Sequence, residues 1–550
     1  MNIFERLPIH RLVTIIGERQ LKDVEGVLEA LNRPDLNVDM INTRGFLSAF
    51  ANQVLGARYL LSGDGVVDLF SSLAKGELDI LIGKLSIPNS FDSREDSIQF
   101  LINYKFNARA KKIVNSFLGY SEYEIESNNS QGKSGYLLLT GCAAPYKPLK
   151  DYQFEVLFEA VEKLKVRDSR FILQMPTGSG KTRTAMEIVS QFLNENCNGS
   201  VIWLAHSTEL CDQASDCFLE VWPHVATREL EFVRHYGEHK LQQQPIGKIV
   251  GFLCSSFQSL LGLIDTNQTA LDKILGGKRL IVVDEAHKVI APTYRRVTKA
   301  LISDGAAVMG LTATPGRSYN ANQSAENEEL AQFFFYNSIS FYPHGMDPIQ
   351  YLRDKKVLAK AKLEPLLISG VDVLLTPTEL NYISKTFELP GEVLSRLGKN
   401  SFRNAEILNR IVRLVTEGEA RSIIFFATSI EQSKLINSLL KFLQVASEHL
   451  DGTTPRIARQ EIVADFRLQK IQVLCNYEVL STGFDAPLVD CVFIARPTAS
   501  VVLYSQMIGR GLRGPAIGGK EKCLIVNVRD NFANFPNVET MYKIFDDYWV

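Results

Sequence analysis

A short loop rich in small residues has the composition of a phosphate-binding site. It reads Met175-Pro176-Thr177-Gly178-Ser179-Gly180-Lys181-Thr182, between the apolar run Phe171–Met175 and a helical pattern from Arg183 to Phe192. Gly178 and Gly180 allow a tight turn whose N–H groups, with the helix start, can face an anion. Lys181 could reach the β- and γ-phosphates of a nucleotide, and Thr182 could hold Mg²⁺. A strict Walker A pattern has glycine where Met175 stands.

An acidic pair stands at the end of another apolar run. Asp284 and Glu285 directly follow Leu280–Val283, and a carboxylate at the carboxyl end of a buried parallel strand lies where ligands bind. Asp284 could hold Mg²⁺ through water, and Glu285 is placed to polarise the attacking water. The plain structural alternatives are a helix-starting acidic pair and a glycine-rich turn. Because the two features occur together, they favour nucleotide hydrolysis, with ATP and Mg²⁺ as expected ligands.

The apolar runs before these residues belong to a repeated pattern. From about residue 145, short apolar runs alternate with longer amphipathic stretches, as in parallel sheets covered by helices. The expected strands of a first sheet are Phe171–Met175, Val201–Ala205, Ile249–Cys254, Leu280–Val283 and Ala307–Leu311. Those of a second sheet are Ser422–Phe426, Ile471–Leu474, Cys491–Ala495 and Cys523–Val526. The sequence predicts an α/β fold with two tandem parallel-sheet lobes, residues 145–330 and 331–545.

Residues 1–140 have the pattern of a mostly α-helical accessory domain. Leu21, Val24, Leu28 and Leu31 fall on one helical face. The segment Ser127–Gly135 is polar and rich in Ser, Asn and Gly, which is typical of a linker. The separate apolar faces predict an independent core, and such a domain could select a substrate or a protein partner.

Composition narrows the class of protein. The chain has 550 residues, 45% of them apolar and 22% charged, with a net charge of -2. This charge excludes a bulk-basic nucleic-acid binder but not a local basic groove. No segment resembles a membrane span or a secretory signal, so a cytoplasmic location is expected. The cysteines form no Cys-x-x-Cys pair, so buried thiols such as Cys254, Cys475 and Cys491 are expected rather than a zinc site.

Further segments resemble motifs of superfamily 2 helicases of the DEAH/DEAD-box type. In family order they are Leu149–Gln153 (Q-motif), Leu204–Leu210 (motif Ia), Ser255–Leu260 (Ib), Gly310–Pro315 (III), Leu480–Pro487 (V) and Gln506–Arg513 (VI). Gly483–Pro487 and Arg496–Thr498 carry the closest likeness, to RadD-like DNA repair helicases, and more loosely to XPB-like and restriction-motor helicases. The chain departs from RadD-like proteins in its added N-terminal domain and in lacking a Cys-rich C-terminal module. The resemblance covers about residues 145–530 and implies two RecA-like lobes.

The resemblance also implies that ATP lies between the lobes. Implied nucleotide contacts are Tyr152, Gln153, Pro176, Thr177, Gly178, Ser179, Gly180, Lys181, Thr182, Gly483 and Asp485, with Gln153 reading adenine. Thr182 and Asp284 would hold Mg²⁺, and Glu285, Gln506, Arg510 and Arg513 would act in hydrolysis. A planar, always ionised guanidinium suits developing phosphate charge. His287, Thr312 and Thr314 would couple this site to the nucleic-acid grip, with turn capping as the alternative for the threonines.

The spacing of Gln506, Arg510 and Arg513 puts all three on one face of a helix, and the pattern over Ser500–Arg513 is helical. Gly509 and Gly511 weaken a helix, which indicates close approach to the nucleotide or to the first lobe. Two surface arginines that pair with nearby acids are the alternative.

Nucleic acid is expected to lie across both lobes and to be held through its backbone. The family-like contacts are Ser207, Thr208, Ser256, Gln258, Thr428, Ser429 and Thr482. Hydroxyls and backbone amides that bind phosphates follow a strand without reading its bases. For each hydroxyl, helix capping or solvation is the alternative.

Two functions remain open from the sequence. The first is an ATP-dependent helicase or translocase, with DNA favoured over RNA, in repair or in defence against foreign DNA. The second is a nucleic-acid-stimulated ATPase switch that recruits a partner within a larger complex and unwinds nothing. A protein partner, such as a nuclease, could bind the N-terminal domain. A built-in nuclease is not expected, because Glu238-His239-Lys240 has no carboxylate partner at a plausible strand end.

Overall fold

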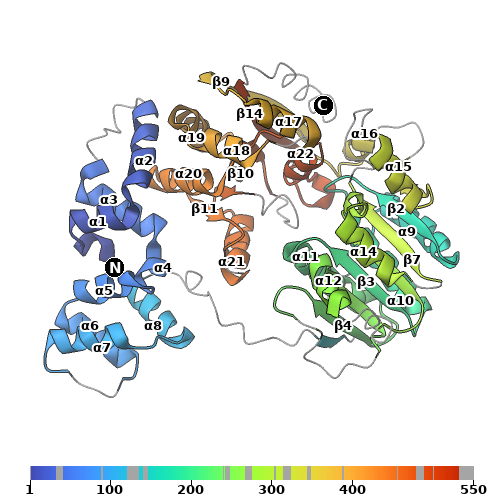
Figure 1. The fold of residues 1–550 in the computed structure, drawn as a ribbon, viewed down its shortest axis with the longest axis horizontal. Helices are drawn as coiled ribbons and strands as arrows, with labels where there is room; N and C mark the ends of the chain where they lie inside the picture. Colours follow the sequence, from blue (N-terminus) through green and yellow to red (C-terminus); the bar gives the residue numbers. More distant parts are fainter. Residues whose placement is uncertain are drawn as a thin grey trace.

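The computed structural model places two α/β lobes and a helical N-terminal domain side by side. It describes residues 2–31, 41–87, 91–119, 136–139, 146–239, 241, 248–266, 275–302, 305–313, 324–342, 348–386, 389–454, 456–477, 488–498 and 501–531. Lobe two lies between the N-terminal domain, on the left, and lobe one, on the right (Figure 1). The predicted fold, two parallel-sheet lobes behind a helical N-terminal region, is confirmed.

The N-terminal domain consists of helices in the part of the chain described. They are η1 (Ile3–Arg6), α1 (Ile9–Ile16), α2 (Glu18–Leu31), α3 (Arg44–Val54), α4 (Gly56–Leu60), α5 (Asp64–Ser72), α6 (Lys75–Lys84), α7 (Arg94–Asn103) and α8 (Ala108–Leu118). As predicted, Leu21, Val24 and Leu28 are buried on one face of α2.

Lobe one is built on a sheet with the strand order β1-β4-β5-β3-β6-β7-β2-β8 among the described residues. Its strands are β1 (Tyr136–Leu139), β2 (Arg170–Gln174), β3 (Ser200–Ala205), β4 (Leu230–His235), β5 (Gly251–Ser256), β6 (Arg279–Asp284), β7 (Ala307–Thr312) and β8 (Ser338–Ser340). All neighbours are parallel except β1, which pairs antiparallel with β4. Two strands, β1 and β8, lie outside the predicted range 145–330.

Helices cover both faces of this sheet because the buried strands carry apolar side chains on both sides. Trp203 packs in the cluster on the side of α9, α10 and α11, and its neighbours Ile202 and Leu204 pack on the side of α12, α14 and α15. The helices are α9 (Asp151–Lys165), α10 (Lys181–Glu195), α11 (Thr208–Val225), α12 (Phe257–Thr266), η5 (Ala286–Lys288), α14 (Pro292–Leu301), α15 (Ser324–Phe333) and α16 (Pro348–Asp354).

Lobe two has a parallel sheet with the order β11-β12-β10-β13-β14-β9 among the described residues. Its strands are β9 (Lys360–Asp372), β10 (Ile423–Phe426), β11 (Ser447–Leu450), β12 (Val473–Asn476), β13 (Cys491–Ile494) and β14 (Lys522–Asn531). Its helices are α17 (Pro377–Thr386), α18 (Gly391–Gly398), α19 (Ser401–Thr416), α20 (Ile430–Phe442), α21 (Arg456–Arg467), α22 (Val501–Ile508) and η7 (Pro515–Ile517).

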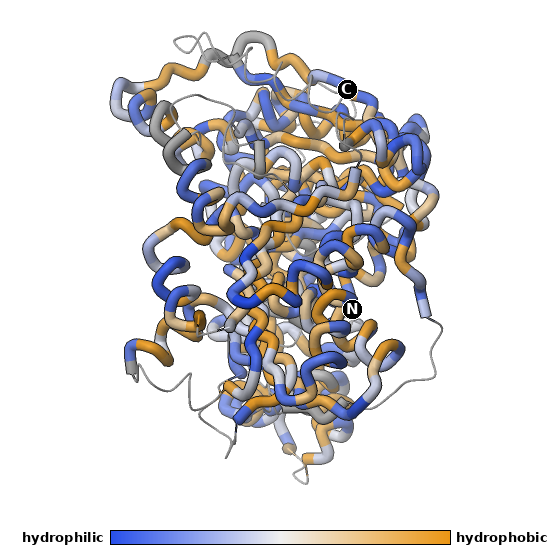
Figure 2. Tube along the Cα trace, turned by 90° about the vertical axis from the view of Figure 1, so that its right-hand side faces the viewer, coloured by the Kyte–Doolittle hydropathy of each residue, from blue (hydrophilic) through white to orange (hydrophobic). Residues whose placement is uncertain are grey.

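The N-terminal domain does not have the independent core that the sequence predicted. Its buried apolar residues form one cluster with those of α19, α20 and one face of the lobe-two sheet. Phe46 of α3 meets Phe442 of α20 edge-on, with 5.0 Å between ring centroids. A Cβ atom on Gly26 of α2 would lie 2.5 Å from Oγ of Ser401 in α19, so these helices approach closely. In the hydropathy-coloured trace, apolar stretches of the chain run through the middle of the molecule (Figure 2).

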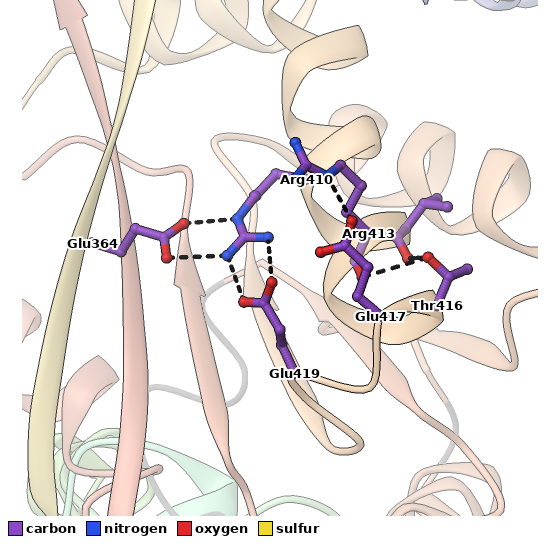
Figure 3. Close-up of polar contacts among 7 residues, drawn as sticks. Glu364, Arg410, Arg413, Thr416, Glu417 and Glu419 are labelled. Carbon is purple, nitrogen blue, oxygen red and sulfur yellow. Dashed lines mark hydrogen bonds and ion pairs between the residues drawn. The ribbon is translucent and has the colours of Figure 1, made fainter.

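Helix α19, which carries this contact, is tied to the lobe-two sheet by charge. Arg410 donates to Glu364 of β9 at 2.7 and 3.0 Å and to Glu419 at 2.9 Å (Figure 3). The hydrogen bonds to Glu364 raise the pKa of the Arg410 guanidinium. Because only 14% of the Arg410 side chain is exposed, this pair is better shielded than a surface salt bridge. α19 is therefore fixed to the sheet on one side and to α2 on the other.

No helix among the described residues is long and apolar enough to cross a membrane. The thiols of Cys254, Cys475 and Cys491 are buried within strands, as the sequence predicted.

Replacing Gly26 with leucine should loosen the joint between the N-terminal domain and lobe two. The added side chain would have to displace Ser401, and overpacking of this kind lowers the free energy of unfolding by about 1–3 kcal/mol. Thermal unfolding of the full chain measures the effect. Gly83→Leu is the matched control, because a side chain at Gly83 of α6 meets open space. Equal unfolding temperatures for the two variants would contradict a tight α2–α19 contact.

Candidate nucleotide site between the lobes

The predicted phosphate loop joins β2 to α10 and has the backbone geometry of an anion cradle. Gly178 and Gly180 have φ angles of 87° and 85°, in the left-handed region that glycine adopts without strain. Helix α10 begins at Lys181, so its free N–H groups follow the loop directly. Met175, where a strict Walker A loop has glycine, is fully buried in the lobe-one core and donates its N–H to the carbonyl of Thr312 at 3.0 Å.

The Q-motif-like segment supports this loop from α9. Tyr152 donates its hydroxyl to the Ser179 carbonyl at 2.7 Å, and Gln153 Nε2 reaches the same carbonyl at 3.2 Å. Gln153 Oε1 also accepts from the N–H of Lys150. A Cβ atom on Gly180 would lie 2.3 Å from Gln153 Nε2, so this glycine leaves room for the amide. The structure thus gives Tyr152 and Gln153 a supporting role at the loop, while adenine reading stays a prediction.

The acidic pair meets the loop through Lys181. Asp284 ends β6, and Glu285 follows with a φ angle of 50°. Lys181 Nζ lies 3.7 Å from Glu285 Oε1, and His287 Nδ1 lies 3.4 Å from Glu285 Oε2. A non-glycine residue in this left-handed conformation is costly, which is common at functional sites. The strand ends therefore bring together residues that stand more than a hundred positions apart in the chain.

The charges of this cluster are removed from water. Burial opposes ionisation of Glu285, but Lys181, with His287 and Lys288, lowers the pKa of this carboxyl below its usual value. Burial raises the pKa of the neighbouring Asp284 carboxyl, and the charge of Glu285 raises it further. Glu285 Oε2 is buried without a hydrogen-bond partner among the described residues. An ionised carboxylate whose Oε2 accepts no hydrogen bond from the described residues, although His287 lies beside it, fits the residue that positions an attacking water.

Motif VI reaches the site, but not on the helix that the sequence predicted. α22 ends at Ile508, and Gly509–Gly511 form a turn, so Arg510 and Arg513 do not continue the face of Gln506. The backbone of Arg513 instead forms a β-bridge with Leu358. The helical prediction over Ser500–Arg513 is therefore wrong beyond Ile508, because two glycines and a competing bridge end the helix.

The two glycines of motif VI approach different parts of the protein. A Cβ atom on Gly509 would lie 2.3 Å from Cγ2 of Thr177, so here lobe two contacts the phosphate loop, as predicted. A Cβ atom on Gly511 would lie 2.4 Å from Sγ of Cys523, so Gly511 packs on its own sheet rather than toward lobe one. Gln506 and Arg510 are buried.

A salt bridge between the lobes was missed by the sequence reasoning. Arg459 of α21 donates to Glu209, in the first turn of α11, at 2.9 Å, and also to the Asp451 carbonyl at 3.2 Å. Helix α21 extends toward lobe one beside α11 (Figure 1). Glu209 stands in motif Ia, but nothing local in the sequence pairs it with Arg459.

The expected nucleic-acid residues mostly lie at helix starts. Ser207, Ser256 and Ser429 each accept from the N–H three residues on, at 3.3, 3.1 and 3.1 Å. Thr428 is buried and donates to Gln432 at 3.0 Å, whereas Thr208 and Gln258 are exposed. These are the capping geometries that the sequence left as an alternative, so their contact with phosphate stays a prediction.

Two of the residues predicted to couple the site to nucleic acid lie beside it, and their coupling role stays a prediction; four other predicted residues lie outside the described residues. Thr312 is buried at the end of β7, the strand between β2 and β6, and His287 is buried beside Glu285. Thr314, Thr482, Gly483 and Asp485 lie outside the described residues.

Comparison with known proteins agrees with this geometry. Residues 146–317 match the family "Type III restriction enzyme, res subunit", and residues 405–514 match "Helicase conserved C-terminal domain". The resemblance to superfamily 2 helicases is therefore confirmed.

Individual relatives are distant. "Putative ATP-dependent helicase IRC3" of Saccharomyces cerevisiae is 25% identical over 69% of this chain and 51% of its own length. A type I restriction enzyme EcoAI endonuclease subunit of Escherichia coli is 21% identical over 66% of this chain and 44% of its own length. The chain thus spans about half the length of these curated relatives. A solved structure of S. cerevisiae Dbp5 bound to RNA and ADP BeF3 has a TM-score of 0.47 at 16% identity, over 73% of this chain and 92% of the other.

Glu285→Gln should separate binding from hydrolysis. The amide keeps the shape of the side chain but cannot take a proton, so we expect ATP turnover to fall by about 10²–10⁴ while ATP affinity is retained. Lys181→Ala is the contrasting variant, because it should weaken ATP binding itself. Steady-state ATP turnover and nucleotide affinity, measured on the same folded proteins, test both expectations. Normal turnover of Glu285→Gln would show that another residue is the general base.

Removing either partner of the bridge between the lobes should slow ATP turnover by about 2- to 5-fold, the equivalent of about 0.5–1 kcal/mol. If the contact itself matters, Glu209→Ala and Arg459→Ala together cost no more than either alone. Lys470→Ala is the matched control, since its partner Asp465 lies within lobe two. Additive effects would show that the two residues act separately.

Proposed function

We propose that this chain, a superfamily 2 helicase by its two motor domains and an ATP-hydrolysing enzyme, is a motor that moves along nucleic acid. The observation that carries the proposal is the contact of motif VI with the phosphate loop at Gly509 and Thr177. It joins a site on lobe one to a lobe that can move, which is what a two-lobed motor requires.

In this proposal the lobe-one residues bind the nucleotide phosphates and polarise the attacking water. The loop N–H groups and Lys181 hold the phosphates, and Glu285 orients the attacking water and takes its proton. Thr182 and Asp284 would hold Mg²⁺, which supplies positive charge at the phosphate oxygens when bound. The buried setting of Lys181 and Glu285 strengthens their electrostatic action, because little water screens them.

Lobe two completes the site only when the lobes meet. Arg510 and Arg513 would add planar positive charge opposite the transferred phosphate. The Glu209–Arg459 bridge and the Gly509–Thr177 contact favour the closed arrangement. Hydrolysis is thereby linked to lobe motion.

The nucleic acid on which the motor acts is proposed to be DNA. Its proposed role is DNA repair or defence against foreign DNA. The restriction-enzyme relative supports DNA and also a nuclease as partner. A Dictyostelium discoideum protein named "Probable ATP-dependent RNA helicase ddx51", 22% identical over 62% of this chain, makes RNA a necessary comparison. The protein is proposed to act in the cytoplasm. The second candidate, an ATPase switch that recruits a partner without unwinding, is favoured by the N-terminal domain fixed to lobe two.

ATP turnover should rise when a single strand is added, because the strand spans both lobes and favours closure. A panel of single-stranded, duplex and forked DNA and single-stranded RNA, each also tested for strand displacement, separates motor from switch. Stimulation without displacement would indicate the switch, and no response to any ligand would contradict both.

Arg513→Ala tests the contribution of lobe two in the same assay. Arginine fingers contribute about 10³–10⁵ in turnover, so this variant should bind ATP and barely hydrolyse it. Arg513→Lys should rescue poorly, because a point charge cannot replace the planar fork. Turnover within a few-fold of the parent chain would contradict the two-lobed site.

A further inference from the structure

A hollow of about 610 Å³ lies on the N-terminal domain, on α7 and its flanking segments, away from the nucleotide site. Phe91, Phe100 and Tyr104 form its apolar side, and Gln99, Asn103 and Lys105 supply polar groups. Helices α6 and α7 stand at the end of the domain opposite α2 (Figure 1). The predicted motor does not use this hollow.

The aromatic side chains form a connected row. Ring centroids are 4.9 Å apart for Phe91 and Phe100, 5.8 Å for Phe100 and Tyr104, and 5.0 Å for Tyr104 and Phe106. Phe106 stacks on the fully buried Phe70, which anchors the row in the core. The three rings in the hollow nevertheless keep partial exposure. A row fixed from behind and open in front presents a rigid platform for a flat ligand.

The segment that holds Phe91 is also fixed. Lys75 Nζ donates to the Phe91 carbonyl at 2.6 Å and to Ser97 at 3.1 Å, and it pairs with Asp79 at 2.7 Å. The platform therefore exists before any ligand arrives, which lowers the entropy cost of binding.

Charges of both signs stand around the platform. Lys105 lines the hollow and Lys111 follows in α8, while Asp92 and Glu95 lie just before Asp96 in the chain. The carboxylate in the hollow, Asp96, accepts from the Ser93 hydroxyl at 2.6 Å and so belongs to the helix cap. The touching rings form a wall rather than a cage around a point charge, and Lys105 beside them disfavours a cationic ligand.

We infer that this hollow binds a base of single-stranded nucleic acid. Aromatic rings stack on any base, the amides of Gln99 and Asn103 can pair with base edges, and Lys105 can contact an adjacent phosphate. The inference rests on the proposed function, because it assumes a nucleic-acid motor. Since the domain shares a core with lobe two, a strand held here moves with that lobe relative to lobe one.

Anisotropy of the full chain with labelled oligothymidylate tests the site. Tyr104→Ala should weaken binding by about 5- to 150-fold, the usual range for losing one base stack. Tyr104→Phe keeps the ring and should bind as the parent chain does. Phe154→Ala removes an aromatic ring that is 61% exposed on α9 of lobe one and should change nothing. Basal ATP turnover without nucleic acid should be equal in all three variants.

Two further probes separate the ways in which the idea can fail. An oligonucleotide with abasic positions should bind the parent chain more weakly and should no longer distinguish Tyr104→Ala from it. Iodouridine should crosslink to the peptide that contains Tyr104. If the parent chain binds strands and the alanine variant binds equally well, the hollow is not a base site, although the motor stands. If the parent chain binds no strand and no strand raises its ATP turnover, the proposed function itself fails.

Discussion

The rest of this molecule depends on one constraint, a cluster of buried charges at the carboxyl ends of the lobe-one strands. Lys181, Asp284 and Glu285 are almost removed from water, and each is stable there only because the others are close. Such a cluster needs a backbone that holds its groups within ångströms, and the parallel strands β6, β7 and β2 provide it by ending side by side. The left-handed turns at Gly178, Gly180 and Glu285 complete the arrangement.

The second lobe and the N-terminal domain form one packed unit. On one face lobe two packs α21 and α22 toward lobe one, and on the other it shares a core with the N-terminal domain. The lobes meet at specific contacts, such as Gly509 with Thr177 and Arg459 with Glu209, and share an apolar cluster that includes Leu358 and Leu512. The joint to the N-terminal domain is also broad and apolar. Motion between the lobes therefore carries the N-terminal domain along.

The sequence predicted correctly those strands whose residue pattern reflects their own burial. The runs before Lys181 and Asp284 are mostly apolar because the middle residues of their strands are buried on both faces, and they were found where expected. The strand β11 was not predicted, since Glu448 and His449 break its apolar run at a sheet edge. The end of α22 was missed because the bridge between Leu358 and Arg513 comes from a distant segment. The shared core and the Glu209–Arg459 pair were missed for the same reason: helix faces show that a surface is buried, not against what.

Because Gly509 and Thr177 lie so close, substitutions at these two positions, which stand in different lobes, depend on each other during evolution. A side chain at 509 would meet both Cβ and Cγ2 of Thr177, so it requires glycine at 177 or a shift of the phosphate loop, and any side chain at 177 requires that 509 remain glycine. The order in which substitutions arise therefore decides which are tolerated, so that an allele neutral in one background is harmful in another. Exchanging one lobe for that of a distant relative meets the same barrier, even when each lobe folds well by itself.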